Sequence, residues 1–235
     1  MQLFYNNTLS EATETIVFDK TESRHIVRVL RKVEGDTLQI TNGKSQLFFA
    51  EITFANDKRC HAKITRIERQ EKPWPYTLHI AIAPTKNNDR YEWFLEKATE
   101  IGIDEITPII CHNSERRVVK TERFQKIVVA AMKQSLKHIV PIVHEPVSFD
   151  EFIEKNAGGD TYIAHCEDGV KTALKCIPKT TGTITILIGP EGDFSPEEIK
   201  KALAKKINAI TLGNSRLRTE TAGVTATHSI SFIYQ

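Results

Sequence analysis

The chain has 235 residues, of which 40% are hydrophobic and 26% are charged, and its formal net charge at pH 7 is +2. This length excludes three domains of ordinary size and leaves one large or two unequal domains. Aliphatic residues recur along the whole chain, which excludes disorder as the main state, and no apolar stretch approaches the ~20 residues of a membrane span. The first residues lack the basic and apolar segments of a secretory signal, so a cytoplasmic protein is expected.

The four cysteines argue against a metal or redox motif. Cys60, Cys111, Cys166 and Cys176 include no C-x-x-C pair. Three of them adjoin a histidine, but neighbours on a strand point to opposite faces, which suits a shared metal poorly. We therefore expect no bound metal and buried free thiols.

Residues 1–72 have the pattern of a small β-barrel with one helix. A helix is expected after a cap at Thr21, with Ile26, Val29 and Leu30 on one face. Strands are expected over 37–41, 46–54 and 60–68, the first two joined by a hairpin turn at Asn42-Gly43. The polar stretch 70–75 has prolines on both sides of Trp74 and predicts a boundary between domains 1–72 and 73–235.

Strands and helices alternate in residues 73–235. Strands are expected over 77–83, 106–111, 161–166, 183–188 and 207–212. Helices are expected from an Asp89–Glu92 capping box, over 121–138, after Ser148 with Glu151, after Ser195 with Pro196, and over 219–234. This alternation predicts an α/β domain with a largely parallel sheet and helices on both faces.

Ligands of open α/β sheets bind in the loops beyond the carboxyl ends of the strands, so the loops after the last three strands are the candidate site. They cover 167–169, 189–194 and 213–221. The glycines that flank Pro190-Glu191 let the backbone pass close to a ligand, although a strand-to-helix turn needs glycine for its dihedrals too. No G-K-[ST] or G-x-G-x-x-G motif is present, which excludes P-loop nucleotide-binding proteins and dinucleotide-binding oxidoreductases.

The last of these loops brings charge to the start of an apolar helix. Arg216, Arg218 and Glu220 lie within five residues. An arginine at a helix N-terminus is unfavourable with the helix dipole, so Arg218 is explained either by simple solvation or by binding a developing negative charge. Further basic residues form either a solvated face or a surface that follows the phosphates of RNA. The candidates for RNA binding are Arg24, Arg28, Arg31, Lys86, Arg90, Arg116, Arg117 and Lys137.

Two motifs resemble those of one enzyme family. The segments LIGPEGDFSPEEI (Leu187–Ile199) and LGNSRLRTETA (Leu212–Ala222) resemble the bacterial 16S ribosomal RNA (uracil-N3)-methyltransferases of the SPOUT superfamily. The segments His25–Arg31 and Glu96–Ile103 also fit, so the resemblance covers essentially the whole chain. The sequence departs from the family at Asp193, where a third glycine is usual, at Asn214-Ser215, and over Leu136–Ile139, which is less rich in arginine.

The resemblance implies an N-terminal PUA-like RNA-binding barrel, a C-terminal domain tied in a deep trefoil knot, and a homodimer. Topology rules argue against knots, so only the resemblance supports this one. It also implies an S-adenosylmethionine pocket formed by the loops at 165–169, 189–193 and 212–218. The cofactor-binding residues it assigns are His165, Ile188, Gly189, Pro190, Glu191, Gly192, Leu212, Gly213, Arg216, Leu217 and Arg218.

The implied chemistry suits the charged residues of these loops. Uracil N3 carries a proton on the Watson–Crick edge, so the target base must be unpaired or flipped out. Loss of that proton leaves negative charge on the uracil oxygens, which Arg218 is expected to stabilise. Glu191 and Glu220 are candidates for removing the proton, and each could equally be a structural cap or hydrogen-bond acceptor.

Two other functions remain open at this stage. One is a non-catalytic RNA-binding protein with the same fold, against which the glycine loops and Arg218 argue. The other is a SPOUT methyltransferase that acts on a different target, such as transfer RNA or a ribose hydroxyl. The N-terminal barrel and the Arg-x-Arg-Thr-Glu-Thr segment favour 16S ribosomal RNA of the small subunit as the partner.

Overall fold

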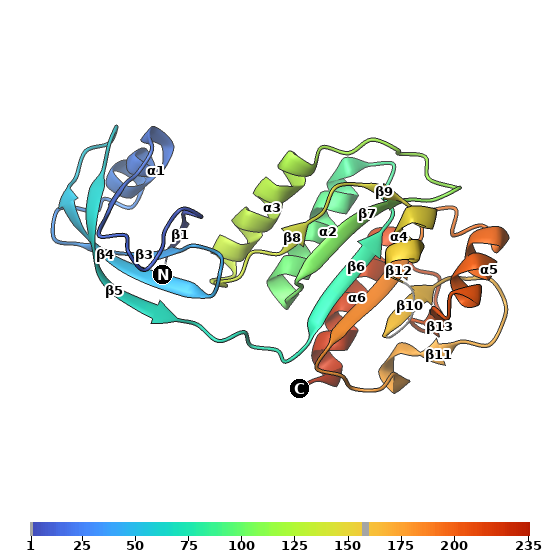
Figure 1. Ribbon diagram of the computed structural model, residues 1–235. Coiled ribbons are helices and arrows are strands. Elements are labelled where there is room, and N and C mark those ends of the chain that lie inside the picture. The colour runs from blue at the N-terminus through green and yellow to red at the C-terminus, as the bar shows by residue number, and fades with distance from the viewer. Residues whose placement is uncertain (1, 157–159) are drawn as a thin grey trace. The chain divides into compact units, whose positions relative to one another are not determined.

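The computed structural model describes residues 2–156 and 160–235 (Figure 1). Its contacts divide the chain into two compact units. The first comprises Met1–Pro73 and Met132–Val140, and the second comprises Trp74–Ala131 and Pro141–Gln235. The sequence predicted a single boundary at residue 72. The structure differs in that residues 132–140, which lie far beyond this boundary in the chain, make their contacts with the first unit.

The first unit is built on a five-stranded sheet. Its strands lie in the order β1 (Leu3–Tyr5), β3 (Thr37–Thr41), β4 (Gln46–Phe54), β5 (His61–Arg69) and β2 (Thr15–Val17). The pair β1–β3 is parallel and the other pairs are antiparallel. The three longer strands are close to their predicted positions. The outer two have three residues each and show no periodicity that a sequence pattern could reveal.

The helix of the first unit begins earlier than predicted. Helix α1 (Lys20–Arg24) continues as a π-helical turn over His25–Val29. The expected cap at Thr21 is wrong, because the Asp19 carboxylate accepts the hydrogen bond from the Glu22 N–H at 2.8 Å. An aspartate at this position also carries negative charge, which the helix N-terminus favours. Ile26 is fully buried in the core of this unit, as its place on the helix face predicted.

The segment 132–140 joins the first unit through its backbone. The Ser45 N–H donates to the His138 carbonyl at 3.0 Å, and the Val140 N–H donates to the Gly43 carbonyl at 3.1 Å. Gly43 lies in the turn between β3 and β4 with a φ of +74°, and a Cβ there would be 2.8 Å from Val140 Cγ2. Glycine is therefore required both by the backbone conformation and by the close approach of the returning segment.

The second unit contains an eight-stranded sheet. A largely parallel sheet was predicted, and every pairing between the described strands is parallel. Its order is β11 (Thr172–Ala173), β13 (Asn208–Thr211), β10 (Thr161–Ala164), β12 (Thr183–Ile188), β6 (Thr77–Ile82), β7 (Glu105–Ile110) and β8 (Ile142–Val143), with β9 (Val147–Ser148) paired to β7. The strands β8, β9 and β11 have two residues each and were not predicted. The central strands β12 and β6 are buried almost throughout, which is typical of a parallel sheet covered on both faces.

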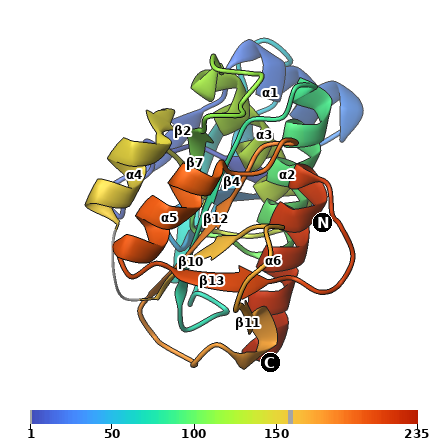
Figure 2. The same ribbon diagram turned by 90° about the vertical axis from the view of Figure 1, so that its right-hand side faces the viewer.

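Helices cover both faces of this sheet, which confirms the predicted architecture. Figure 2 shows α4 (Phe149–Lys155) and α5 (Pro196–Ala204) on one face and α2 (Asn88–Ile101) and α6 (Thr219–Ile233) on the other. The helix α3 (Thr121–Gln134) stops short of the expected residue 138, because Leu136 takes a left-handed φ of +54°. Within the described part of the chain, no helix has the length and apolar character needed to cross a membrane.

The helix starts follow the local capping signals in two cases and not in a third. Complete capping boxes join Ser148 to Glu151 and Ser195 to Glu198, as predicted. The predicted box between Asp89 and Glu92 is wrong. Asn87 caps α2 instead, and the Glu92 carboxylate accepts from the Arg123 guanidinium at 2.9 Å.

A glycine allows α6 to pack closely against α2 and β6. A Cβ at Gly223 would be 2.6 Å from two ring atoms of Phe94 and 2.9 Å from Ile82 Cδ1. Replacing Gly223 by valine is expected to lower the free energy of unfolding by about 3 kcal/mol, since overpacking outweighs the better helix propensity of valine. Denaturant unfolding measures this loss.

The double variant Gly223→Val/Phe94→Ala tests whether the clash with the Phe94 ring causes the loss of stability in Gly223→Val. Its loss should be smaller than the sum of the two single losses, because the truncated ring leaves room for the valine. Additive losses, or an unchanged stability of Gly223→Val, would show that the close contact does not limit the packing of α6.

Candidate active site

Three loops at the carboxyl edge of the sheet meet because their strands are neighbours. The strands β13, β10 and β12 are adjacent and parallel, so the segments that follow them leave the sheet at the same edge. These segments begin at His165, Gly189 and Leu212. The structure therefore brings together the loops that the sequence identified from strand ends alone.

Two adjoining cavities lie among these loops. The smaller has a volume of about 380 Å³ and the larger about 750 Å³. They share six lining residues, which are Ala164, Cys166, Asp193, Arg216, Leu217 and Ala222. Each of the eleven residues predicted to bind a cofactor lines at least one of the two cavities. Both volumes are within the usual range for small-molecule sites.

The glycine loop after β12 is held in place by contacts at both ends. A Cβ on Gly189 would be 3.1 Å from the Phe194 backbone nitrogen, which is closer than nine in ten Cβ contacts in proteins. The Thr219 hydroxyl donates to the Gly189 carbonyl at 3.1 Å and so links the start of α6 to this loop. Thr219 and Phe194 are both buried, which makes this part of the site rigid.

Asp193 fills the position where the related family usually has a glycine. Its φ is +61°, a left-handed conformation that aspartate tolerates better than most residues. One carboxylate oxygen accepts from the Cys166 N–H at 2.7 Å, and the other accepts from the Phe194 N–H at 2.8 Å. Asp193 therefore ties the loop after β12 to the loop after β10. Sequence reasoning noted the substitution but did not predict this bond.

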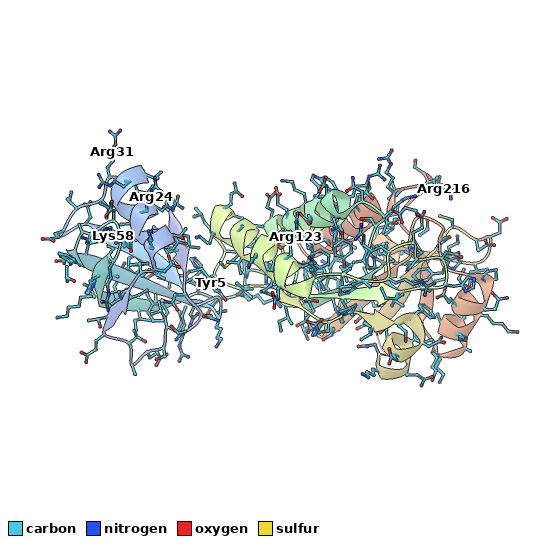
Figure 3. The ribbon with its side chains drawn as sticks, turned by 90° about the horizontal axis from the view of Figure 1, so that it is seen from above. Tyr5, Arg24, Arg31, Lys58, Arg123 and Arg216 are labelled. Atoms are coloured by element: carbon cyan, nitrogen blue, oxygen red, sulfur yellow. The ribbon has the colours of Figure 1, made fainter. Side chains whose placement is uncertain are left out.

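Two arginines border the cavities. Arg218 is the N-cap of α6, is exposed, and lines the smaller cavity. Arg216 is also exposed and lines both cavities, and Figure 3 shows it at the surface of the second unit. Both guanidinium groups are thus placed to meet an anion at this edge of the sheet.

The two candidate carboxylates differ in their surroundings. Glu191 is exposed and lines the smaller cavity, and its Oε1 accepts from the Lys86 N–H at 2.9 Å. Glu220 is only 6% exposed and lines neither cavity. Its Oε1 lies 3.9 Å from Arg90 Nε, and its buried Oε2 has no hydrogen-bond partner. Only Glu191 shares a cavity with Arg218.

Burial controls the protonation of the side chains after β10. It lowers the pKa of His165, and the nearby Lys171 acts in the same direction, so this imidazole stays neutral at pH 7. Partial desolvation and the nearby Asp193 carboxylate raise the pKa of Cys166, which remains a thiol although the residue as a whole is exposed. Cys166 and Cys176 are exposed, so the expectation of buried thiols is correct only for Cys60 and Cys111.

The predicted RNA-contacting residues fall into two sets. Arg24, Arg28 and Arg31 are exposed in the first unit, and Figure 3 shows Arg24 and Arg31 at its helical segment. Arg28 forms an ion pair with Asp57 at 2.8 Å. Lys137 also lies in the first unit and is partly buried.

The second set lies in the second unit, where Lys86 contacts Glu191. Lys86 pairs with Glu115 at 2.8 Å, and Arg116 donates to the carbonyls of Thr85 and Lys86. Arg117 donates to the His112 carbonyl at 3.2 Å. Arg116 therefore holds the backbone beside Glu191 in place, whereas Lys86 and Arg117 keep their charges at the surface.

Comparison with known proteins agrees with this arrangement. The RNA methyltransferase domain family matches residues 70–231, and the RNA methyltransferase PUA domain family matches residues 18–65. A protein of Rickettsia conorii, ribosomal RNA small subunit methyltransferase E, is 30% identical over 230 residues, which cover 96% of this chain and 92% of the relative.

Solved structures share the whole fold. One from Porphyromonas gingivalis has a TM-score of 0.92 and 38% identity, covering 100% of this chain and 98% of that chain. The Neisseria gonorrhoeae ribosomal RNA small subunit methyltransferase E, bound to S-adenosyl methionine, has a TM-score of 0.87 and 27% identity over the same shares of the two chains.

The mixed α/β fold, the first unit and the loop cavities together define an RNA methyltransferase with a PUA-like domain. The resemblance drawn from the two loop motifs is thereby confirmed. The chain belongs to the ribosomal RNA small subunit methyltransferase E family.

Proposed function

We propose that this protein transfers a methyl group from S-adenosylmethionine to N3 of a specific uridine in 16S ribosomal RNA. The observation that carries the proposal is the presence of Arg218 and Glu191 on one cavity at the carboxyl edge of the sheet. Membership of the methyltransferase family supports the reaction class. The choice of N3 rests on the resemblance to the uracil-N3-methyltransferases, and the chemistry of this charged pair is consistent with it.

The residues around the two cavities fit S-adenosylmethionine. This cofactor carries a positive sulfonium, an ammonium and a carboxylate, and it supplies the methyl group. The carboxylates of Glu167, Asp168 and Asp193 line the larger cavity and suit the positive groups, while Arg216 suits the carboxylate. The buried Ile188 and Pro190 supply apolar surface for the remainder.

The side chains that face the base act on its proton and its charge. The Glu191 carboxylate is an acceptor for the N3 proton, and its position is held by the Lys86 N–H. The Arg218 guanidinium stabilises the negative charge that develops on the uracil oxygens as the proton leaves. Methyl transfer in line with the acceptor is mainly a positioning problem, which the rigid loop at Gly189 solves.

The basic residues supply the contact with RNA. We assign phosphate contacts to Arg24, Arg28 and Arg31 in the PUA-like first unit, and to Lys86, Arg90 and Arg117 in the second unit. Lys137 and Arg116 complete the predicted set, although Arg116 also holds the backbone near Glu191. Because the overall charge is only +2, we propose that a homodimer brings two such surfaces to the small subunit.

The proposal has three remaining parts. The domain limits of 1–72 and 73–235 rest on the polar stretch around Trp74, and action in the cytoplasm rests on the pattern of the first residues. A deep trefoil knot in the second domain is proposed on the family resemblance alone, in which the cofactor pocket is formed by knotted loops.

The decisive experiment compares small-subunit RNA from cells with and without this gene by mass mapping of nucleotides. We expect one N3-methyluridine of 16S RNA to disappear and to return on expression of the gene. Persistence of that methyl group with loss of another would indicate a different RNA target. If no methyl group changes and calorimetry detects no S-adenosylmethionine binding, the protein is a non-catalytic RNA-binding relative.

Asp193 provides a test of the proposed cofactor site. Replacing it by glycine is expected to weaken S-adenosylmethionine binding by about fivefold to tenfold, because both hydrogen bonds to the carboxylate are lost, including the one that ties the two loops together. Stability should fall by about 1–3 kcal/mol because of the lost hydrogen bonds, although glycine adopts the left-handed φ without strain. Isothermal titration calorimetry and denaturant unfolding provide the two measurements.

Asp193→Asn is the matched control for this prediction. Asparagine tolerates the same φ and keeps an oxygen that can accept from the Cys166 N–H, so it should retain most of the affinity. Unchanged affinity in Asp193→Gly would show that the tie between the two loops does not shape the cofactor site.

A further inference from the structure

Three potential metal ligands gather at the opposite, amino edge of the parallel sheet. His79 lies on β6 and is paired in register with Glu105, the first residue of β7. His144 directly follows β8, and its N–H donates to the Ile106 carbonyl at 2.9 Å. Paired residues of adjacent parallel strands project to the same face, so the strand register itself brings these side chains together.

The donor atoms lie close enough to share one ion. One ligand atom from each of His79, Glu105 and His144 lies within 4.8 Å of the other two. His144 Nε2 is 2.8 Å from Glu105 Oε2. Donors about 2.0–2.1 Å from a tetrahedral zinc ion are about 3.4 Å apart, so binding needs only side-chain adjustments within this group.

The surroundings orient the buried histidine as a ligand. His79 Nε2 forms a 2.7 Å hydrogen bond with the Thr107 hydroxyl, and the two imidazole rings have centroids 5.5 Å apart. This bond holds the buried ring in place and leaves Nδ1 for a metal, as in ligating histidines whose second nitrogen is held by a hydrogen bond.

A cavity of about 630 Å³ opens onto the three side chains. Glu145, Glu151 and Asp160 also line it, with Lys155 as a single positive charge. The excess of carboxylates attracts a cation, and the cavity leaves room for water at a fourth position. None of these residues borders the cavities at Arg218, so this site is distinct from the proposed active site.

We propose that His79, Glu105 and His144 bind a divalent transition-metal ion of the zinc type. Two imidazoles and one carboxylate suit zinc and its neighbours better than magnesium or calcium, which prefer sets of oxygen ligands. The ion links β6, β7 and the segment after β8, and it therefore stabilises the second unit. The sequence predicted no metal because its adjacent Cys–His pairs suit a shared ion poorly, whereas this group contains no cysteine.

The test uses the full chain after dialysis against a chelator. Zinc chloride should bind with one site per chain in calorimetry and should raise the melting temperature, because an ion that binds only the folded state stabilises it. Magnesium chloride at the same concentration should do neither. Cobalt should give the visible absorption of a low-coordinate site. The absence of saturable zinc binding would overturn the proposal.

Variants then assign the ligands. His144→Gln should weaken zinc binding by about 100-fold or more, and its ring is 39% exposed, so the fold should tolerate the change. Glu105→Gln should act in the same direction. His61→Gln, in the first unit, is the control and should bind zinc as the unchanged chain does. Equal affinity of His144→Gln and the unchanged chain would show that zinc binds elsewhere, and the assignment would be wrong.

Discussion

Replacing Arg218 by alanine is expected to reduce methyl transfer to small ribosomal subunits by about 10²–10³-fold, the usual cost of removing one group that stabilises developing charge. Arg218 is the exposed N-cap of α6 and lines the same cavity as Glu191. Its charge is unfavourable at a helix N-terminus, so the substitution should leave the stability nearly unchanged or slightly increased. Single-turnover methylation with a labelled cofactor measures the effect.

Two further measurements separate catalysis from cofactor binding. S-adenosylmethionine affinity in Arg218→Ala should stay within a few-fold of the unchanged chain, because Arg216 and the carboxylates of the larger cavity remain. Arg218→Lys keeps the charge but loses the planar fork, and it should recover only part of the rate. Near-normal turnover in Arg218→Ala would overturn the role that we assign to this arginine.

The second large effect is expected at Glu191. The Glu191 carboxylate accepts from the Lys86 N–H at 2.9 Å. Glutamine keeps an oxygen that can accept this hydrogen bond, but it cannot take up a proton at pH 7. Glu191→Gln is therefore expected to lower the rate of methyl transfer by about 10²-fold while the loop keeps its conformation. The rate is measured in single turnover on small subunits, with cofactor affinity determined in parallel.

The conservative substitution distinguishes the two roles of Glu191. If the carboxylate is only a hydrogen-bond acceptor, Glu191→Gln should be nearly as active as the unchanged chain, and only Glu191→Ala should lose activity. In that case Glu220, whose buried Oε2 has no hydrogen-bond partner, becomes the residue to examine as the base.

Much of the second unit could be predicted because its signals are local. The apolar run at 183–188 forms a buried central strand, and Ser148 and Ser195 form complete capping boxes with the glutamates three residues later. Strands of two or three residues carry no such signal, since they are defined by the partner that they pair with. For the same reason the sequence could not show that residues 132–140 return to the first unit.

The candidate active site could also be predicted from the sequence, because loops after adjacent parallel strands must meet at one edge. The hydrogen bond between Asp193 and Cys166 could not be predicted, since it depends on a left-handed backbone at a residue that is not glycine. The group of His79, Glu105 and His144 was missed because only the register of β6, β7 and β8 brings together three residues so far apart in the chain.

The return of residues 132–140 to the first unit has a consequence for the order in which the protein folds during synthesis. A ribosome that has released only residues 1–73 has not yet made the backbone that bonds to Gly43 and Ser45, or the lysine that pairs with Glu22. Almost sixty residues of the second unit must therefore be synthesised before the first unit can form its last contacts. A fragment cut at the proline-tryptophan boundary would lack these contacts for good, although it contains all five strands of the sheet.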